Sequence, residues 1–302
     1  MQAAHNASAV ERSGSSMRLG SRYFDFDHEL VVMAIVNRTP DSFYDRGATF
    51  DLEVALEHTA EHIAAGADII DVGGVKAGPG HPVNPDEELE RVLPFVEAFR
   101  ERFSAPLSVD TYRAGVAAAA LSAGANLIND SSGMSEPEIA DVVAAHPGSG
   151  LVITHHGGPL RSRPLRPDYD PDVVGAAIDH CATLAQHAVQ RGVRREQIIV
   201  DPGHDLYKTT AQSLELTRRL GELAELGYPV LVALSNKDFI GEALGLELSE
   251  RGDASLAAAV FAVLHGARIV RAHDAVATVR ALRMVEVLLG WRTPEHTLRG
   301  LD

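Results

Sequence analysis

The chain is a succession of short apolar runs, each of which ends in a polar residue. The first run, residues 31–36, holds six consecutive apolar residues, most of them β-branched, and it stops at Asn37. Such a run predicts a strand that is buried on both faces. Residues 39–42 (Thr-Pro-Asp-Ser) then predict a turn into a loop. A polar side chain is therefore expected at the carboxyl end of a core strand.

The same arrangement recurs along the whole chain. Further strands are predicted at residues 67–72, 106–110, 126–130, 151–155, 197–201, 229–234 and 268–271. Helices are predicted at residues 51–65, 86–103, 112–123, 136–145, 171–191, 211–225, between 237 and 265, and at 274–289. Eight strands that alternate with helices indicate a parallel sheet. Because no Gly-x-Gly-x-x-Gly turn is present, the pattern favours an α/β fold with a single (β/α)8 barrel over an open doubly wound sheet.

The polar residues at the predicted strand ends form two chemical groups. The strand ends are Asn37, Asp71, Asp110, Asn129, His155, Asp201, Lys237, and Arg271 with His273. In a (β/α)8 barrel the carboxyl ends of the strands form the catalytic face. Asp110, Asn129, Asp201 and Lys237 offer donors and acceptors to one planar, amide-rich heterocycle. The alternative is that Asp110 and Lys237 form a buried ion pair with each other.

The second group carries donors suited to a phosphate or diphosphate. It consists of Asn37, Arg271 and His273. Guanidinium and imidazole groups bind phosphate oxygens well. Asn37 and Asp110 also offer the oxygen ligands that a hard cation such as Mg²⁺ prefers. Spacing alone therefore indicates a barrel enzyme for a phosphorylated heterocycle.

Composition narrows the class of protein. With 302 residues, of which 45% are hydrophobic, the chain can bury a large core. The net charge of −15, with scattered Lys and Arg, argues against nucleic acid and against an anionic membrane surface. The lone Cys181 excludes an internal disulfide, and no apolar run approaches the roughly 18 residues of a membrane span. We expect a cytoplasmic protein in which residues 1–20 are a disordered tail and residues 21–302 form one domain.

Two histidines require a separate interpretation. His58 and His62 lie four residues apart on a predicted helix, a spacing that zinc sites use. Glu57 and Glu61 stand beside them, as on a solvated face, and no other zinc motif accompanies them. We therefore expect a surface histidine pair and no structural zinc. His155, at the end of a core strand, is expected to face the site.

Several of these segments together resemble the dihydropteroate synthase family over residues 24–290. The matching segments are Ile-Val-Asn-Arg-Thr-Pro-Asp-Ser-Phe at 35–43, Gly-Ala-Asp-Ile-Ile-Asp-Val-Gly-Gly at 66–74, Ser-Val-Asp-Thr at 108–111, Gly-Ala-Asn-Leu-Ile-Asn-Asp at 124–130, Asp-Pro-Gly at 201–203, Lys-Thr at 208–209, Leu-Ser-Asn-Lys at 234–237 and Arg-Ala-His-Asp at 271–274. The resemblance implies a (β/α)8 barrel of folate biosynthesis, usually a homodimer. The family joins 6-hydroxymethyl-dihydropterin diphosphate to 4-aminobenzoate with Mg²⁺ and releases pyrophosphate.

The resemblance also implies a role for each of the two groups. Asp110, Asn129, Asp201 and Lys237 would hold the pterin ring. Asn37, Arg271 and His273 would hold the diphosphate, with Asn37 near the metal. Because diphosphate leaves before the amine is captured, groups that stabilise the departing charge should carry much of the rate.

The loops depart from the family pattern in several places. Where the family reads Gly-Gly-Glu-Ser-Thr-Arg-Pro-Gly, residues 73–80 place Val75, Lys76, Ala77 and Gly78. The family's Arg in Ser-Arg-Lys is replaced by Asn236. Residues 201–207 stand in place of a Gly-Phe-Gly type sequence, which changes an aromatic wall at Leu206 and adds Asp205 near an anionic substrate. Thr-His-His-Gly at 154–157 replaces Met-His-Met, and Arg38, where Val is usual, adds a cation to the first loop.

These departures predict a divergent paralogue with little or no synthase activity. Two or three independent losses of roughly 1–3 kcal/mol reduce a rate by about 10³ or more. One alternative is an active synthase in which Lys76 and Arg38 replace the lost Arg. Another is a non-catalytic protein that binds a pterin- or folate-like ligand; room for 4-aminobenzoate or a mimic is expected of the impaired paralogue. A third is a methyltransferase acting on a reduced folate, which would need a corrinoid partner. The apolar stripe of the helix at 274–289 indicates either a dimer interface or packing on its own barrel.

Overall fold

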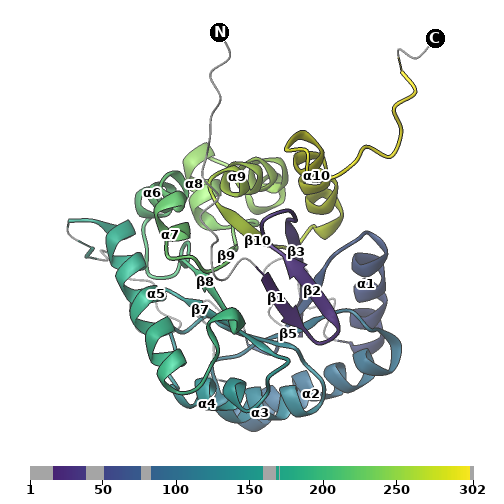
Figure 1. Ribbon diagram of the computed structural model, residues 1–302, viewed down its shortest axis with the longest axis vertical. Helices are drawn as coiled ribbons and strands as arrows, with labels where there is room; N and C mark the ends of the chain where they lie inside the picture. The colour runs from purple at the N-terminus through teal and green to yellow at the C-terminus, as the bar shows by residue number, and fades with distance from the viewer. Residues whose placement is uncertain (1–15, 39–50, 76–82, 159–167, 170, 300–302) are drawn as a thin grey trace.

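A closed eight-stranded parallel barrel surrounded by helices forms the body of the molecule (Figure 1). The computed structural model describes residues 16–38, 51–75, 83–158, 168–169 and 171–299. The barrel strands follow the order β10-β3-β4-β5-β6-β7-β8-β9, so each predicted strand pairs with its neighbour in the chain and the last with the first. The predicted single (β/α)8 barrel is confirmed.

The strands and helices lie close to their predicted ranges. The strands are β1 (Ser16–Leu19), β2 (Arg22–Asp25), β3 (Val31–Asn37), β4 (Ile69–Gly73), β5 (Leu107–Asp110), β6 (Leu127–Asp130), β7 (Gly150–Thr154), β8 (Ile198–Asp201), β9 (Val230–Val232) and β10 (Ala267–Ala272). The α-helices are α1 (Leu52–Ala64), α2 (Pro85–Arg102), α3 (Ala114–Ser122), α4 (Glu138–Ala144), α5 (Val173–Gln190), α6 (Thr210–Arg218), α7 (Leu220–Ala224), α8 (Asp238–Leu244), α9 (Gly252–Leu264) and α10 (Ala275–Leu288). Short 3₁₀ turns lie at Arg195–Gln197 and Leu248–Glu250.

Local chemistry explains where the helices begin and end. The Asp51 carboxylate caps α1 by accepting hydrogen bonds from the amides of Glu53 and Val54. The single helix expected at 211–225 is instead two helices, because the chain leaves helical geometry at Arg219. The guanidinium of Arg219 is held by carboxylates, including that of Asp172, which caps α5. No helix among the described ranges is long and apolar enough to cross a membrane.

The amino-terminal residues 16–25 form a hairpin, although a disordered tail is expected through residue 20. Strands β1 and β2 pair antiparallel, and the Gly20 amide donates to the Gly148 carbonyl just before β7. Met17, Leu19, Phe24 and Phe26 are buried against the barrel interior. The tail prediction is therefore wrong for residues 16–20. Two four-residue strands carry too short an alternation to be recognised. Residues 1–15 lie outside the described residues.

Alternation along the strands divides the barrel interior into two layers. The side chains of Met33, Ile69, Leu127, Val152, Ile199, Leu231 and Ile269 form an apolar layer that packs on the hairpin. Two residues farther along five of these strands, the next inward side chains are polar: Asp71, Asn129, Thr154, Asp201 and Arg271. The intervening side chains, such as Val32 and Ile70, pack outward against the helices. The interior therefore changes from apolar at the amino ends of the strands to polar at their carboxyl ends.

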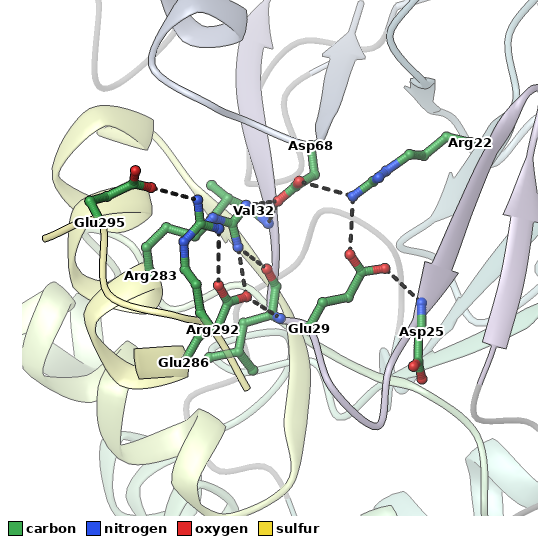
Figure 2. A network of polar contacts seen from close by, with 10 residues as sticks. Arg22, Asp25, Glu29, Val32, Asp68, Arg283, Glu286, Arg292 and Glu295 are labelled. Carbon is green, nitrogen blue, oxygen red and sulfur yellow. Dashed lines mark hydrogen bonds and ion pairs between the residues drawn. The ribbon is translucent and has the colours of Figure 1, made fainter. Parts of the chain in front are cut away.

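A network of ion pairs lies on one side of the amino end of the barrel, between α10 and the start of β3 and β4 (Figure 2). Arg283 of α10 contacts Asp68, just before β4, at 2.7 Å and Glu286 at 2.8 Å. The same carboxylates accept hydrogen bonds from the amides of Val32 (2.9 Å) and Leu30 (2.8 Å), where β3 begins. The last helix is thereby joined to the first two strands of the barrel.

Candidate functional site

Arg271 lies at the centre of the polar layer. Its guanidinium donates from Nε to Asp71 at 2.6 Å and from Nη2 to Asp110 at 3.1 Å. The Asn129 amide donates to the same Asp71 oxygen at 3.3 Å. These residues belong to β10, β4, β5 and β6, so the contacts cross the barrel interior. Burying a guanidinium is favourable only when carboxylates compensate its charge, and two of them do so here.

This pairing decides one alternative that the sequence left open. Arg271, expected among the diphosphate residues, contacts Asp110 of the other group, and its binding of diphosphate stays a prediction. The suggested Asp110–Lys237 ion pair is wrong, because Arg271 is the partner of Asp110. Burial raises the pKa of Asp110 to about 7, with Arg271 opposing that rise and Asp71 adding to it. The carboxyl of Asp110 is therefore poised to gain a proton near neutral pH.

Asp201 anchors the opposite side of the cluster. One of its carboxylate oxygens accepts a hydrogen bond from the Gly203 amide at 2.7 Å. Burial raises the pKa of Asp201, and the nearby ammonium groups of Lys237 and Lys208 oppose this rise. Lys237, the N-cap residue of α8, donates to the His204 carbonyl. Burial lowers the pKa of Lys237, while Asp205 and Asp201 favour its charged form.

Lys208 is a buried lysine that is absent from both predicted groups of site residues. Its ammonium donates to the carbonyls of His155 (3.0 Å), Gly203 (2.9 Å) and Leu206 (2.9 Å). All three ammonium donors are thus used to join the end of β7 to the loop after β8. Burial lowers the pKa of Lys208 to about 7. The Lys-Thr segment after Asp-Pro-Gly was the signal that could have identified it.

A buried ion pair on the outer side of Asp110 was also missed. Arg113 contacts the fully buried Glu88 of α2. Burial raises the pKa of Glu88, and one of its carboxylate oxygens has no hydrogen-bond partner. Glu88 in turn contributes to the raised pKa of Asp110. Glu88 shares the buried face of α2 with Val92, Phe95 and Phe99, so the helical spacing of those apolar residues is the signal that distinguishes it from the exposed Glu90.

Asn37 and His273 lie at the carboxyl ends of the adjacent strands β3 and β10. Asn37 is the last residue of β3 and is in register with Gly73 of β4. The His273 ring contacts the Ser235 hydroxyl at 3.1 Å, after β9. Both therefore lie at the same end of the barrel as Arg271, and their binding of diphosphate stays a prediction.

The altered loop positions are only partly described. Lys76, Ala77 and Gly78 lie outside the described residues, and Val75 is half-buried at the end of its range. Asn236 is buried with a φ of 57°, in the left-handed region that asparagine tolerates. The backbone amide of Asn236 donates to the Ser255 hydroxyl at 2.9 Å. Asn236 is thus tied to α9.

Arg38 and His155 point away from the polar layer. The Arg38 side chain is buried, and its Nε donates to the Arg91 carbonyl of α2 at 3.4 Å. His155 packs edge-on against His180 of α5, at 4.9 Å between ring centroids. Because Thr154 faces inward, the next side chain must face the helices. The expectation that His155 faces the site is wrong, and burial lowers its pKa to about 2.

The His58 and His62 pair is not a solvated face. Their ring centroids are 4.1 Å apart, and His62 is 3% exposed. His62 shares the buried face of α1 with Ala55 and Thr59, at the spacing of one helix face. Burial lowers the pKa of His62 to about 4. Among the residues that the structure describes, no group of three or more His, Cys, Asp and Glu side chains could hold a metal ion.

Comparison with known proteins identifies the family to which this chain belongs. The profile of the family described as pterin binding enzyme matches residues 33–273. The chain belongs to this family. A Mycobacterium leprae protein named Inactive dihydropteroate synthase 2 is 50% identical over 276 residues, which cover 90% of this chain and 94% of the relative. This family member is therefore a divergent dihydropteroate synthase homologue.

Solved structures agree with the family in fold. The dihydropteroate synthase of Yersinia pestis, solved with a sulfonamide drug complex, has a TM-score of 0.86 at 34% identity, covering 91% of this chain and 99% of that one. The Burkholderia cenocepacia synthase, complexed with 7,8-dihydropteroate, has a TM-score of 0.80 at 38% identity, covering 91% and 97%. The barrel fold is thus shared over nearly the full length of these structures.

Proposed function

We propose that this homologue binds a pterin at the polar end of its barrel and carries out the synthase reaction very weakly or not at all. The observation that carries the proposal is the contrast between an assembled cluster and altered loops. Asp71, Asp110, Asn129 and Arg271 are joined by hydrogen bonds within one layer. The relatives named inactive, at 50% identity, support the same conclusion.

The polar layer matches the edges of a pterin ring. The carboxylates of Asp110 and Asp201 would accept hydrogen bonds from ring N–H and amino groups. Asn129 would both donate and accept, and Lys237 would donate to a ring carbonyl or nitrogen. Because charge-assisted hydrogen bonds are each worth roughly 1.5–3 kcal/mol, these groups would dominate the affinity. The Burkholderia cenocepacia complex with 7,8-dihydropteroate supports a ligand of this class.

Mg²⁺ fits this site only together with a phosphorylated ligand. Asp71 and Asp110 are paired with Arg271, which leaves the Asn37 amide oxygen as the protein ligand that we propose. Mg²⁺ is commonly bound by one or two protein oxygens together with substrate phosphates. Bound there, it would neutralise part of the charge of a diphosphate. Asn37 and His273 would then position that group at the mouth of the barrel.

The same geometry weighs against an ordinary synthase. In the family an Arg walls the 4-aminobenzoate site, and here the neutral Asn236 stands at that position, tied to Ser255. Of the two cations that could replace the lost Arg, Arg38 is buried against α2 and donates to a backbone carbonyl, and Lys76 lies outside the described residues. Loss of cationic donors would slow the reaction, because donors that face a departing diphosphate stabilise the transition state most.

We also propose that the protein forms a homodimer through α9 and α10. These helices lie side by side on the outer surface (Figure 1). The inner face of α10, with Val279 and Leu282, is buried on the barrel. Phe261, Leu264, Met284 and Leu288 are each at least 40% exposed. A second copy of the chain would cover these apolar side chains. Size-exclusion chromatography with light scattering of the Leu264→Glu variant tests the proposed dimer.

Titration calorimetry tests the proposed function. 6-Hydroxymethyl-dihydropterin diphosphate is titrated with Mg²⁺, and 4-aminobenzoate is then added to the same cell, with the Yersinia pestis synthase as the positive control. We expect binding of the pterin without heat of reaction and without dihydropteroate on chromatography. Turnover of about 1 per second or faster would overturn the proposed inactivity. No binding of any pterin would overturn the proposed ligand class.

A further inference from the structure

The loop after β8 is held closely against the end of β7. Gly203 has a φ of 68°, and a β-carbon on it would lie 2.1 Å from the His155 carbonyl oxygen, so a larger residue cannot take its place without a shift. Asp205 and Tyr207 of the same loop have φ values of 61° and 56°, which are strained for residues that carry side chains. Such a backbone persists only where surrounding contacts fix it.

Lys208 supplies contacts that fix this loop. Its buried ammonium lies 3.0 Å from the carbonyl oxygen of His155 and 2.9 Å from those of Gly203 and Leu206. The lysine itself stands on a rigid base, because the next residue, Thr209, begins α6 with a capping box. Lys208 thereby joins the end of β7, the loop after β8 and the start of α6.

Two of these three carbonyls belong to residues that also hold Asp201. The His155 amide donates to the Asp201 carbonyl at 2.9 Å, and the Gly203 amide donates to one Asp201 carboxylate oxygen at 2.7 Å. Among the described residues, no donor bonds the other carboxylate oxygen, which is therefore available to a ligand. The Lys208 ammonium thus fixes both residues that orient Asp201.

The free-energy cost of burying Lys208 indicates that this arrangement has a use. The acceptors of its ammonium are backbone carbonyls, and no carboxylate of the described residues lies within ion-pair distance of it. The Tyr169 ring adds only a weak cation–π contact, at 5.8 Å from the ring centroid. An ammonium without a paired carboxylate is costly to bury, and an apolar side chain of similar volume would avoid that cost. Stability alone therefore does not explain the lysine.

We propose that Lys208 is a positioning residue that fixes Asp201 in the orientation in which its available carboxylate oxygen binds a pterin. The inference rests on the proposed function, since it assumes that a pterin occupies the polar layer. Lys208 acts through His155 and Gly203, and it does not touch the ligand. Part of the pterin affinity therefore depends on a side chain that lies behind the strand ends.

A double-mutant cycle between Lys208 and Asp201 tests the inference. Calorimetry measures the affinity of 6-hydroxymethyl-dihydropterin, a probe that lacks the diphosphate and so does not depend on the altered diphosphate loops. Lys208→Met should weaken binding about tenfold and Asp201→Ala about 100-fold. Adding Lys208→Met to Asp201→Ala should weaken binding by less than about twofold more, because the carboxylate that the lysine positions is already gone.

Two further variants separate positioning from general stability. Arg100 is a cation that also donates to backbone carbonyls, those of Gly124 and Ala105 at 2.8 Å each, but at the amino ends of β5 and β6. Arg100→Met should lower the free energy of unfolding in urea, as Lys208→Met does, and leave pterin affinity within about twofold of the wild type. Lys208→Gln keeps a donor and should weaken binding less than Lys208→Met. It takes the place of Lys208→Met in the cycle if the latter does not fold.

Three results would contradict the inference and leave the proposed function intact. The first is an unchanged affinity in Lys208→Met, and the second is an equal loss from that substitution with and without Asp201. The third is a loss in Arg100→Met as large as in Lys208→Met, which would assign the effect to general destabilisation. If the wild type binds no pterin, the proposed function fails together with the inference.

Discussion

The two ends of the barrel are built on opposite principles. At the amino end the interior is apolar, the hairpin covers it, and the surrounding carboxylates are paired with arginines or backbone amides (Figure 2). At the carboxyl end lie buried polar atoms without partners: Asp71 Oδ1, Glu88 Oε1, His155 Nδ1 and His204 Nδ1. The described non-glycine residues with positive φ, Met134, Asp205, Tyr207 and Asn236, all lie in loops that follow carboxyl ends of strands. Left-handed backbone strain among the described residues is thus concentrated at the end where a ligand would bind, whereas buried polar atoms without partners also occur elsewhere, at His58, His62 and Ser108.

The largest expected effect comes from the amino end. Phe24 is fully buried and stacks on Phe26 at 6.1 Å between ring centroids. Replacing it with Ala removes a large buried side chain from the hairpin, so Phe24→Ala should lower the free energy of unfolding by about 3–5 kcal/mol. Urea unfolding measures this. Pterin affinity of the folded variant should stay within about twofold of the wild type, and a large affinity loss would mean that the two ends are coupled.

At the carboxyl end the expected effects fall on binding. Asp110→Asn removes one carboxylate and leaves Arg271 paired with Asp71. A lost charge-assisted hydrogen bond costs roughly 1.5–3 kcal/mol, so pterin affinity should fall about 10- to 150-fold with little loss of stability. Calorimetry at pH 7.5 measures the affinity. A variant that binds the pterin normally but unfolds more easily would show that Asp110 stabilises the fold and does not bind the ligand.

The same residue predicts the pH dependence of binding. Burial raises the pKa of Asp110 to about 7, and only the ionised carboxylate accepts two ring hydrogen bonds. Wild-type affinity should therefore be full above pH 7 and decline as the pH falls below it. Calorimetry at pH 5.5, 6.5 and 7.5 measures the decline, which Asp110→Asn should abolish.

The two ends also differ in how much of their structure could be predicted from the sequence. The strands, the helices and the polar strand ends follow from local periodicity, and all eight barrel strands were predicted. The partners of Arg271 could not be predicted, because Asp71 and Asp110 are 200 and 161 residues away in the chain. The direction of His155 depends on a one-residue register that an apolar run does not fix. The burial of His62 depends on which face of α1 meets the barrel.

His62 provides a further prediction, on acid stability. Burial lowers its pKa from 6.5 to about 4, so the folded protein holds His62 neutral while the unfolded chain protonates it. The contribution is fully present above pH 6.5 and is lost as the pH falls toward 4, at a cost of about 2 kcal/mol by pH 5. His62→Leu should flatten the pH dependence of urea unfolding between pH 5 and 8. The exposed His296→Ala control should leave the dependence as it is in the wild type.

The smallest effect should come from the outer part of the amino-end network. Arg22 contacts Glu29 at 3.0 Å, but its side chain is 47% exposed and water screens the pair. Arg22→Ala should therefore lower the free energy of unfolding by less than about 1 kcal/mol. Arg283→Ala removes the nearest guanidinium of the largely buried Asp68 and Glu286 carboxylates and should cost several times more, because only the longer contacts to Arg22 (3.8 Å) and Arg292 (3.7 Å) remain. Urea unfolding measures both losses of stability. Equal losses for the two variants would mean that each ion pair counts the same whatever its burial. A larger loss for Arg283→Ala would show that the buried contacts of Arg283 stabilise this end of the barrel.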